Sequence, residues 1–508
     1  MVDAPDDTPR LRLDLLAALP ADLTAAGYTV DGVEAALGPV AAAALHREQR
    51  LPADLATRDR SEPVAVLLRL LALGLGVDRD RLEAALPTLG VAGLEGLGLV
   101  EAGSLRPLCD LRPYADDSHA WWVASDLSEL VTGPPLREDH VLGIGGASTT
   151  LAAWTIRGPV ARALDLGTGC GVQALHLSAH AETIVATDVS ARALDYARFN
   201  AALAGLDLDL RQGSLLEPVA AERFDLVVSN PPFVITPRAD GVPVFEYRDG
   251  GLVGDGFVES LVRSVGSVLE PGGVAQLLGN WEVPRGTTWR ERWTEWLRGT
   301  GLDAWVVQRD EQDPAEYAEL WARDSGSQAG VAGFEELYAA WLADFAARDV
   351  ERIGFGVVTL QRPATDRAPW VDLVEATGPV APAMGATVEA GLVARTWLAE
   401  HGDAGLLDTA WRCAADVTEE RHTRPNAEHP GVILLRQGGG LRRAIRLDTV
   451  LSGLVSVCDG TLTARQALVA IAELLEVDPQ AVVTSALPVL RELVADGLLL
   501  DAGDAGPA

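Results

Sequence analysis

The sequence predicts an α/β fold in which an open, parallel sheet carries a ligand site at the carboxyl ends of its strands. An apolar run over residues 161–166 leads into the glycine-rich segment 165–171, and a run with helical spacing follows over 172–179. Another apolar run, 224–229, ends at Asn-Pro-Pro-Phe, residues 230–233. A strand, a glycine turn and a helix N-terminus in this order are typical of a cradle for a nucleotide-like ligand.

The overall composition indicates a globular protein with an acidic surface. The chain has 508 residues, of which 48% are hydrophobic, so it can bury several cores, and its length suggests about three domains. It carries 41 basic and 73 acidic residues, a net charge of -32, and every basic residue is an arginine. Such a surface repels nucleic acid at long range, which disfavours RNA as a partner but leaves a local basic groove possible.

The cysteines and the N-terminus predict a cytoplasmic protein. Cys109, Cys170, Cys413 and Cys458 lie far apart with no Cys-x-x-Cys spacing, so neither a disulfide framework nor a metal site is expected. The first residues are acidic where a secretory signal would be basic. The apolar stretch 64–77 is short and is interrupted by an arginine, so we expect no membrane partner. The oligomeric state stays open.

Residues 1–120 are expected to form an N-terminal domain that is mainly helical. Apolar residues recur at helical spacing within 11–26, 30–45 and 63–73. The stretch 90–111 is compatible with a small hairpin, which would make the domain winged-helix-like. The alternative is a helical cap that only packs against the next domain. No residue in this part of the chain carries chemistry.

The motifs lie in the central residues, 121–362. The glycines at positions 167, 169 and 171 have the spacing G-x-G-x-G, which differs from the G-x-G-x-x-G of dinucleotide-binding loops. The next apolar run, 183–187, ends in Asp188. A carboxylate at this place can accept hydrogen bonds from both hydroxyls of a ribose, as in dinucleotide folds. The loop and the acid together predict a cofactor that contains a nucleoside.

The segment 165–171, Asp188 and the Asn-Pro-Pro-Phe run together resemble the class I S-adenosylmethionine (SAM)-dependent methyltransferases of the Asn-Pro-Pro-aromatic type. That group includes polypeptide-glutamine N5 methyltransferases and rRNA guanine-N2 methyltransferases. The resemblance extends over roughly half of the chain. It implies a Rossmann-like, seven-stranded methyltransferase sheet within residues 121–362, with SAM as the cofactor.

The resemblance assigns the glycine loop to the methionine part of SAM. Gly167, Gly169 and Gly171, with Thr168 between them, would let the backbone approach this part of the cofactor. Asp165, at the end of the preceding strand, would accept a hydrogen bond from the SAM ammonium group or would polarise a bound water.

The same resemblance assigns two further segments to the nucleoside. Asp188 and the adjoining Val189 would bind the ribose. Related enzymes often have an acid at the position of Ser214, where it reaches the adenine amino group. This chain departs from that pattern, so Ser214 or the backbone of Leu215 would bind adenine more weakly.

A segment upstream of the glycine loop, 139–150, is rich in glycine, serine and threonine. In the methyltransferases that the chain resembles, a segment of this kind closes over the cofactor. Ser148 and Thr149 are therefore candidate cofactor contacts. The alternative is an ordinary helix N-cap, for which serine and threonine are common choices.

The Asn-Pro-Pro-Phe run predicts chemistry at a planar nitrogen, whose lone pair is delocalised and therefore difficult to methylate. Acceptors for both N–H groups would favour a pyramidal nitrogen, and the side-chain oxygen of Asn230 and the carbonyl of Pro231 can serve as these acceptors. Pro231 and Pro232 make the turn rigid, and Phe233 would lie flat on the substrate. Because the sulfonium of SAM is an activated donor, positioning carries most of the rate and no strong base is needed.

Two segments after this run are candidates for the substrate side. Residues 245–256 resemble the Gly/Asp-rich segment of polypeptide-glutamine methyltransferases, and Glu246, Tyr247 and Arg248 would line the substrate mouth unless the segment is a solvated loop. A helical insertion over 313–348 is long enough to lie over the active site. Its aromatic residues are expected to pack in a core: Trp321, Phe334, Tyr338 and Trp341.

Residues 363–508 are expected to form a C-terminal α+β domain that resembles the small winged helices attached to some peptide-modifying enzymes. Pro/Ala-rich residues 363–382 predict a linker and a docked strand, and the glycines 438–440 predict a hairpin followed by three helices. Four arginines form the densest basic patch in the sequence: Arg436, Arg442, Arg443 and Arg446. The patch would recognise an acidic peptide or an RNA backbone, or would pair with carboxylates of the chain itself.

The sequence leaves several functions in competition. The favoured one is a SAM-dependent N-methyltransferase that acts on an amide or amine nitrogen of a protein or peptide. An rRNA or tRNA base methyltransferase, acting on guanine N2 or adenine N6, is the alternative, and a small metabolite is the third possible methyl acceptor. A catalytically inactive SAM-binding scaffold or sensor belongs to another class, and the intact Asn230 and Pro231 oppose it. A nicotinamide-dependent oxidoreductase is opposed by the G-x-G-x-G spacing.

Overall fold

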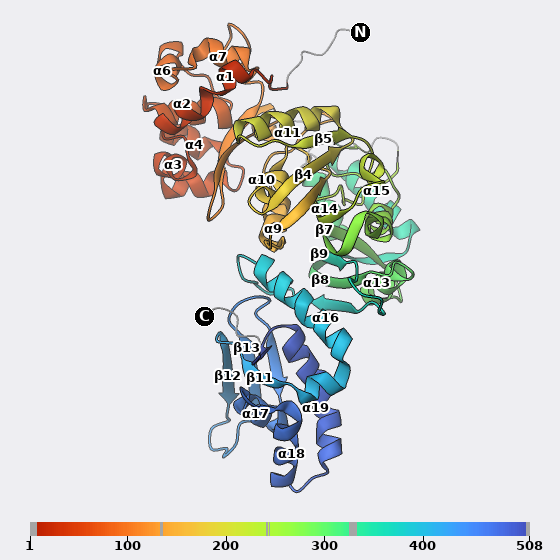
Figure 1. Cartoon of the computed structure of the whole chain (residues 1–508). Coiled ribbons are helices and arrows are strands. Elements are labelled where there is room, and N and C mark those ends of the chain that lie inside the picture. Colours follow the sequence, from red (N-terminus) through yellow and green to blue (C-terminus); the bar gives the residue numbers. More distant parts are fainter. Residues whose placement is uncertain (1–7, 133–135, 240–241, 243, 325–332, 504–508) are drawn as a thin grey trace. The chain divides into compact units, whose positions relative to one another are not determined.

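The chain divides into two compact units. In this computed structural model, residues 8–132, 136–239, 242, 244–324 and 333–503 are described. Unit 1 consists of Met1–Ala152, Pro159–Thr300 and Glu311–Phe355, and unit 2 of Ala153–Gly158, Gly301–Asp310 and Gly356–Ala508. Figure 1 shows the elements of both units, coloured along the sequence. The three domains predicted from the sequence, divided near residues 120 and 362, stay a prediction.

Among the described residues, the largest sheet has eight strands in the order β10-β8-β9-β7-β6-β3-β4-β5. The five strands of unit 1 at one side, β7-β6-β3-β4-β5, pair in parallel, which confirms the predicted parallel α/β sheet. The bounds of the eight strands are β3 (Val160–Leu166), β4 (Ala181–Asp188), β5 (Asp209–Gln212), β6 (Phe224–Ser229), β7 (Leu269–Pro284), β8 (Asp303–Gln312), β9 (Val350–Gln361) and β10 (Val371–Glu375).

Seven of the eight strands, β3 to β9, lie within residues 121–362, in agreement with the seven strands predicted there, and β10 is an additional strand from outside that range. Strand β10 pairs in parallel with β8 inside unit 2 and forms the end of the sheet. Two contacts just before β10 hold the chain there. The carbonyl of Trp370 accepts a hydrogen bond from the Ala304 N–H at 2.9 Å, and the guanidinium of Arg367 donates to the buried carboxylate of Asp303 at 2.7 Å. The Pro/Ala-rich stretch therefore contains the docked strand that its composition suggested.

The sheet register brings the predicted motif residues to one edge. Asp165 near the end of β3 lies opposite Ala186 of β4 and Val228 of β6. Since the three strands are parallel and adjacent, their carboxyl ends meet at the same edge. Strand β6 is almost entirely buried, in keeping with its apolar run. Asp165, Asp188 and Asn230 thus follow three neighbouring strands.

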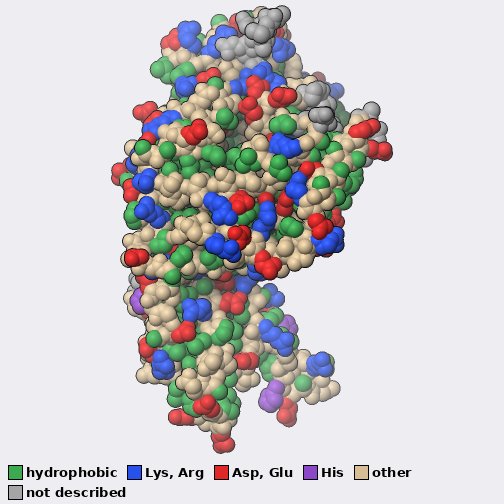
Figure 2. Space-filling model, turned by 90° about the vertical axis from the view of Figure 1, so that its right-hand side faces the viewer, with side chains coloured by type: hydrophobic (Ala, Val, Ile, Leu, Met, Phe, Trp, Pro, Cys, Tyr) green, Lys and Arg blue, Asp and Glu red, His purple; other side chains and the backbone are tan. Residues whose placement is uncertain are grey.

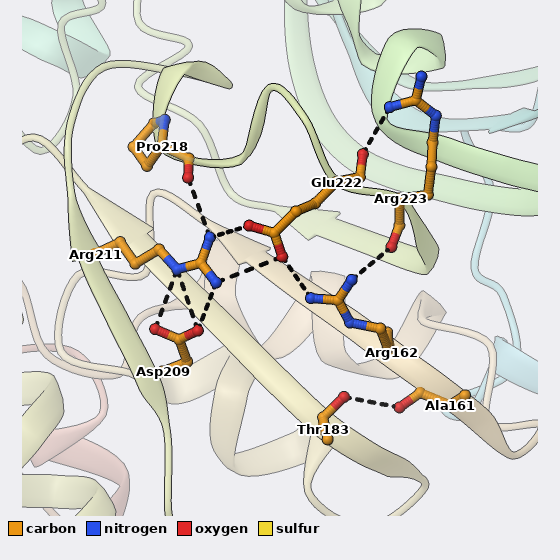
Figure 3. A network of polar contacts seen from close by, with 8 residues as sticks. All are labelled: Ala161, Arg162, Thr183, Asp209, Arg211, Pro218, Glu222 and Arg223. Atoms are coloured by element: carbon orange, nitrogen blue, oxygen red, sulfur yellow. Dashed lines mark hydrogen bonds and ion pairs between the residues drawn. The ribbon is translucent and has the colours of Figure 1, made fainter.

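The connection between β5 and β6 is held by an ion-pair network that Figure 3 shows from close by. The carboxylate of Glu222, just before β6, accepts from Arg162 of β3 and from Arg211 of β5. Arg211 also donates to the carbonyl of Pro218 at 3.1 Å. The turn after β5, which contains Ser214, is therefore tied to two strands.

The helices of unit 1 fall into two groups. The first contains α1 (Leu13–Leu16), α2 (Leu19–Ala25), α3 (Val30–Leu45), α4 (Arg50–Thr57), α5 (Pro63–Leu67), a π-helical turn (Leu68–Ala72), α6 (Arg79–Ala85) and α7 (Gly90–Gly96). The second contains α8 (Glu129–Thr132), α9 (Gly146–Trp154), α10 (Val172–Leu177), α11 (Ala191–Leu203), α12 (Gly256–Ser264), α13 (Trp289–Leu297), α14 (Pro314–Asp324) and α15 (Phe334–Ala347). Short 3₁₀ turns lie at Glu217–Val219 and Val265–Val268.

The N-terminal helices share one hydrophobic core with the helix that follows β4. That core contains Tyr28 together with Tyr196 and Phe199 of α11. A hairpin of β1 (Asp110–Ala115) and β2 (Ala120–Ser125) belongs to the same core. The stretch 90–111 contains α7 and then a minimal hairpin with an antiparallel bridge between Val100 and Pro107.

Beyond its share of the large sheet, unit 2 contains two small antiparallel sheets. Sheet β15-β11-β16 consists of β15 (Asp459–Thr463), β11 (Ala410–Cys413) and β16 (Leu499–Asp501), and sheet β12-β13-β14 of β12 (Val417–His422), β13 (Val432–Gln437) and β14 (Ala444–Leu447). The helices are α16 (Gly385–Asp408), α17 (Thr449–Ser456), α18 (Ala464–Leu474) and α19 (Pro479–Ala495). The hairpin around 438–440 and the three helices after it lie where the sequence predicted them.

Of the four arginines in the predicted basic patch, two pair with carboxylates of unit 2. Arg436 contacts Glu420 at 2.7 Å, and Arg443 contacts Asp496 at 3.0 Å. Figure 2 shows basic and acidic side chains interspersed over one face of the molecule. In the part of the chain that is described, no helix has both the length and the apolar character that a bilayer crossing requires.

Candidate active site

A pocket of about 400 Å³ lies at the carboxyl ends of the parallel strands, and all of its walls belong to unit 1. Its size is within the range of small-molecule and cofactor sites. The walls come from segments 140–148, 166–173, 187–193, 213–215, 229–232 and 246–261. The predicted residues on these walls are Ser148, Gly167, Thr168, Gly169, Asp188, Val189, Ser214, Leu215, Asn230, Pro231, Pro232, Glu246 and Tyr247.

Asp165 lies fully buried behind the glycine loop. Its Oδ2 accepts from the Thr168 hydroxyl at 2.6 Å and from the Ala174 N–H at 2.9 Å, so it holds both ends of the loop. Its Oδ1 is buried and has no hydrogen-bond partner among the described residues. Burial raises the pKa of Asp165 to about 7. The charge of Asp188 contributes a small part of this rise, and the two hydrogen bonds oppose it.

The three glycines of the loop have left-handed backbones, with φ of 71° at Gly167, 55° at Gly169 and 91° at Gly171. A β-carbon on Gly167 or Gly169 would have no heavy atom within 4 Å, whereas one on Gly171 would meet Ala197 at 3.4 Å. The first two positions therefore require glycine for the backbone conformation and not for space. Gly171 does not lie on the pocket wall but caps the N-terminus of α10.

Asp188 follows β4 and faces the glycine loop. Its Oδ2 accepts from the Gly169 N–H and its Oδ1 from the Ser190 N–H, both at 2.9 Å. Burial raises the pKa of Asp188, and these backbone hydrogen bonds oppose the rise. Val189, beside it, is 58% exposed at the rim of the pocket. The carboxylate thus joins the ends of β3 and β4 and still faces the pocket.

Asn230 follows β6 and also lies on the pocket wall. Its side-chain Oδ1 is buried and, within the described residues, has no hydrogen-bond partner. The preceding Ser229 donates to the Leu166 carbonyl at 2.7 Å, which fixes the end of β6 against β3. A buried acceptor without a donor is costly in free energy unless a ligand supplies one.

Phe233 is not among the wall residues. It forms a bridge with Asp249 and packs beside the aromatic core of the insertion, which contains buried Trp341 and Phe334. The aromatic residues of the insertion thus pack in a core, as the sequence predicts. The stacking of Phe233 on a substrate stays a prediction.

The two candidate residues of the upstream segment lie differently. Ser148 is on the pocket wall, where its carbonyl accepts from the Gln173 side chain at 2.9 Å. Thr149 is exposed and lies off the wall, and its hydroxyl donates to the carbonyls of Gly145 and Gly146 of its own helix region. The structure therefore does not bring Thr149 to the other predicted residues.

Two residues that the sequence analysis did not single out shape the mouth. His140 lies on the wall, with its ring 5.9 Å from that of Tyr247, and the Glu246 N–H donates to the Glu138 carbonyl at 2.9 Å. Burial lowers the pKa of His140, although the nearby carboxylate of Asp126 opposes this. Arg248 does not line the pocket. Its side chain is buried, with the guanidinium carbon 4.6 Å from the ring centre of Phe245 and 5.8 Å from that of Trp321.

Asp126 is the second of these residues. It accepts from the Val141 N–H at 2.7 Å and from the Tyr196 hydroxyl at 2.8 Å, and it pairs with Arg192. It thereby fixes the mouth segment to α11. Its partners on α11 are far away in the sequence, so no local pattern could have identified it.

Two family models match parts of the chain. Residues 146–242 match the Methyltransferase small domain, and residues 25–106 match a Domain of unknown function (DUF7059). The first match covers the glycine loop, Asp188 and the Asn-Pro-Pro-Phe run, and it confirms the predicted resemblance to methyltransferases.

Curated relatives are similar to part of the chain. The release factor glutamine methyltransferase of Deinococcus radiodurans is 42% identical over 125 residues, which are 23% of this chain and 44% of that protein. The ribosomal protein uL3 glutamine methyltransferase of Bradyrhizobium diazoefficiens is 33% identical over 149 residues, 27% of this chain and 46% of that protein. The ribosomal RNA small subunit methyltransferase C of Salmonella arizonae is 29% identical over 181 residues, 35% of this chain and 46% of that protein. The chain thus spans less than half of the length of each of these relatives.

Proposed function

We propose that this protein is a SAM-dependent N-methyltransferase that transfers a methyl group to a planar amide or amine nitrogen, most favourably in a protein or peptide. The observation that carries the proposal is that Asn230, whose buried Oδ1 has no hydrogen-bond partner within the described residues, lies on the wall of the same pocket as the glycine loop and Asp188. A nucleoside cofactor on one side and a hydrogen-bond acceptor for an N–H group on the other are the two parts that this reaction needs.

The cofactor half of the pocket fits SAM. Asp188 can accept the ribose hydroxyls, since a carboxylate has about four acceptor positions and backbone N–H groups do not occupy them all. Gly167 and Gly169 have no side chain between the backbone and the pocket. The unpaired Oδ1 of Asp165 is an acceptor for an ammonium group, directly or through a water, and Ser214 and Leu215 lie on the wall for the adenine.

The acceptor half of the pocket orients the nitrogen. When bound, SAM supplies a methyl group on a positively charged sulfur, which is an activated donor. In this proposal Asn230 Oδ1 accepts one N–H of the substrate, and the carbonyl of Pro231 accepts the other. Together they favour a pyramidal nitrogen whose lone pair points at the methyl group, so positioning contributes most of the rate.

A protein amide is favoured over a nucleic acid because of the charges on the walls. Asp188, Glu246 and Asp249 are the charged residues on the described walls, and none of the wall residues there is an arginine. A nucleic acid strand needs cations along its phosphates, whereas an amide side chain is neutral. Two of the relatives are named as glutamine methyltransferases. The relative named as an rRNA methyltransferase makes an RNA base the second candidate.

A SAM-binding scaffold without catalysis is the weakest of the three candidates. Such a protein would be more stable with a different residue at position 230, one that leaves no buried oxygen without a hydrogen-bond partner. We also propose that the protein is cytoplasmic. Its terminal domains are proposed to be winged-helix-like and to select the methyl acceptor.

Methyl-labelled SAM and a cell extract provide the test. The protein is incubated with both, and the extract is then separated into protein, RNA and small-molecule fractions. We expect label in protease-sensitive material with the wild type and not with Asn230→Ala. Label in the RNA fraction would show that the methyl acceptor is a nucleic acid base and not a protein amide. Absence of label in all fractions, while calorimetry detects SAM binding, would support the scaffold.

A further inference from the structure

Helix α14 contacts two pocket loops with side chains one helical turn apart. The hydroxyl of Tyr317 accepts from the Ile235 N–H at 3.0 Å and from Nδ2 of Asn280 on β7 at 2.9 Å. The guanidinium carbon of Arg248 lies 5.8 Å from the ring centre of Trp321, close enough for a cation–π contact. Residues four apart lie on the same face of a helix, so one face of α14 supports both loops.

These two loops form the acceptor half of the pocket. Ile235 follows shortly after Asn230, and Arg248 lies between the wall residues Tyr247 and Asp249. The loops are also joined to each other, because the Val234 N–H donates to the Arg248 carbonyl at 2.9 Å. Tyr317 itself is not a wall residue, so it acts on the pocket only through these loops.

The position of Tyr317 is fixed on all sides. Its ring is fully buried, with the ring centres of Trp341, Phe345 and Phe355 at 5.8, 5.6 and 5.5 Å. Burial raises the pKa of Tyr317, so the hydroxyl stays neutral at physiological pH. Its oxygen has two lone pairs, which match the two N–H donors. Ile235 is 1% exposed, so its N–H would lose its acceptor if this oxygen were removed.

We propose that Tyr317 is a positioning residue for methyl transfer: its hydroxyl fixes the turn after Asn230 and thereby the direction of the unpaired Asn230 oxygen. The helical insertion is then part of the catalytic apparatus and more than a cover. This inference rests on the proposed transferase function for its kinetic consequence, but its structural part holds independently of the reaction.

The matched variants are Tyr317→Phe and Tyr338→Phe. The first removes only the hydroxyl that binds Ile235. The second removes the hydroxyl of another tyrosine of the insertion, whose ring stacks on Phe334 with centres 5.7 Å apart. We expect Tyr317→Phe to bind SAM within about twofold of the wild type and to transfer methyl groups to the protein fraction about tenfold more slowly at saturating SAM. Tyr338→Phe should match the wild type in both.

Amide hydrogen exchange separates this inference from the proposed function. Peptides that cover 230–237 should exchange faster in Tyr317→Phe, whereas peptides that cover 165–171 should not change. If the wild type transfers no label, the proposed function fails and the exchange data alone decide the inference. Unchanged exchange at 230–237 would overturn it, as would a transfer rate within twofold of an active wild type. A parallel loss of SAM affinity, rate and thermal stability would reduce Tyr317 to a core residue.

Discussion

The Oδ2 atom of Asp188 accepts a hydrogen bond from the backbone N–H of Gly169 at 2.9 Å. The residue proposed to bind the ribose therefore also holds the loop proposed to bind the methionine part of SAM. Ser190 donates to the other carboxylate oxygen at 2.9 Å, so the side chain has one orientation. Both halves of the cofactor site depend on this single carboxylate.

Replacing Asp188 by alanine should weaken SAM binding by roughly 10- to 100-fold, because hydrogen bonds to a charged group contribute about 1.5–3 kcal/mol. Isothermal titration calorimetry measures this change. Asp209→Ala is the matched control, since this exposed carboxylate pairs with Arg211 away from the pocket walls and its loss should leave the affinity unchanged. Unchanged affinity in Asp188→Ala would remove the ribose assignment.

Asn230→Ala should separate binding from turnover. The variant loses the acceptor for the substrate N–H but no contact of the glycine loop, so SAM affinity should stay within about twofold while methyl transfer falls on the order of 100-fold. Calorimetry and label transfer measure the two quantities. Asn426→Ala, at an exposed asparagine of unit 2, should change neither. Normal turnover in Asn230→Ala would contradict the role of the unpaired oxygen.

Asp165 should make the ligand-free protein less stable as the pH rises. Its pKa is about 7 in the folded protein and near 3.8 in the unfolded chain, so its contribution to stability is complete below about pH 4 and is lost as the pH rises through about 7. Asp165→Asn removes this titration. We therefore expect the free energy of unfolding of Asp165→Asn minus that of the wild type, measured in urea, to be larger at pH 8 than at pH 5. The same difference at both pH values would contradict the raised pKa.

Asn200→Ala should be strongly destabilising. The side chain of Asn200 is 1% exposed. Its Oδ1 accepts from the Ala124 N–H at 2.7 Å, and its Nδ2 donates to the carbonyls of Ala124 and Cys170, both at 2.8 Å. Its loss leaves buried backbone groups without partners, at a cost of about 2–3 kcal/mol. Urea unfolding measures this cost. Gln49→Ala, at an exposed position, should have no measurable effect, and an equal effect of both variants would contradict the argument.

The parts of the site that the sequence predicted are those with local signals. Gly167 and Gly169 stand in a glycine-rich turn directly after an apolar run, and Asp188 and Asn230 each stand directly after another. Parallel pairing of the three strands was sufficient to bring these residues to one edge. The order of the element types was enough to predict the α/β fold.

The parts that the sequence did not predict depend on partners distant in the chain. Asn200 binds Ala124, 76 residues away, and Tyr317 binds Ile235, 82 residues away. Neither residue stands in a pattern that differs from an ordinary amphipathic helix. Phe233 was assigned by its motif alone, and its partly buried side chain packs against the core of the insertion.

The bond between Asn200 and Ala124 sets a limit on how the protein can be dissected. The methyltransferase family match begins at residue 146, beyond strand β2. A fragment cut there would keep Asn200 and lose its partner, and the pocket would lose His140. A fragment that keeps this bond together with the whole β1–β2 hairpin must therefore include Asp110, although no sequence motif marks that boundary.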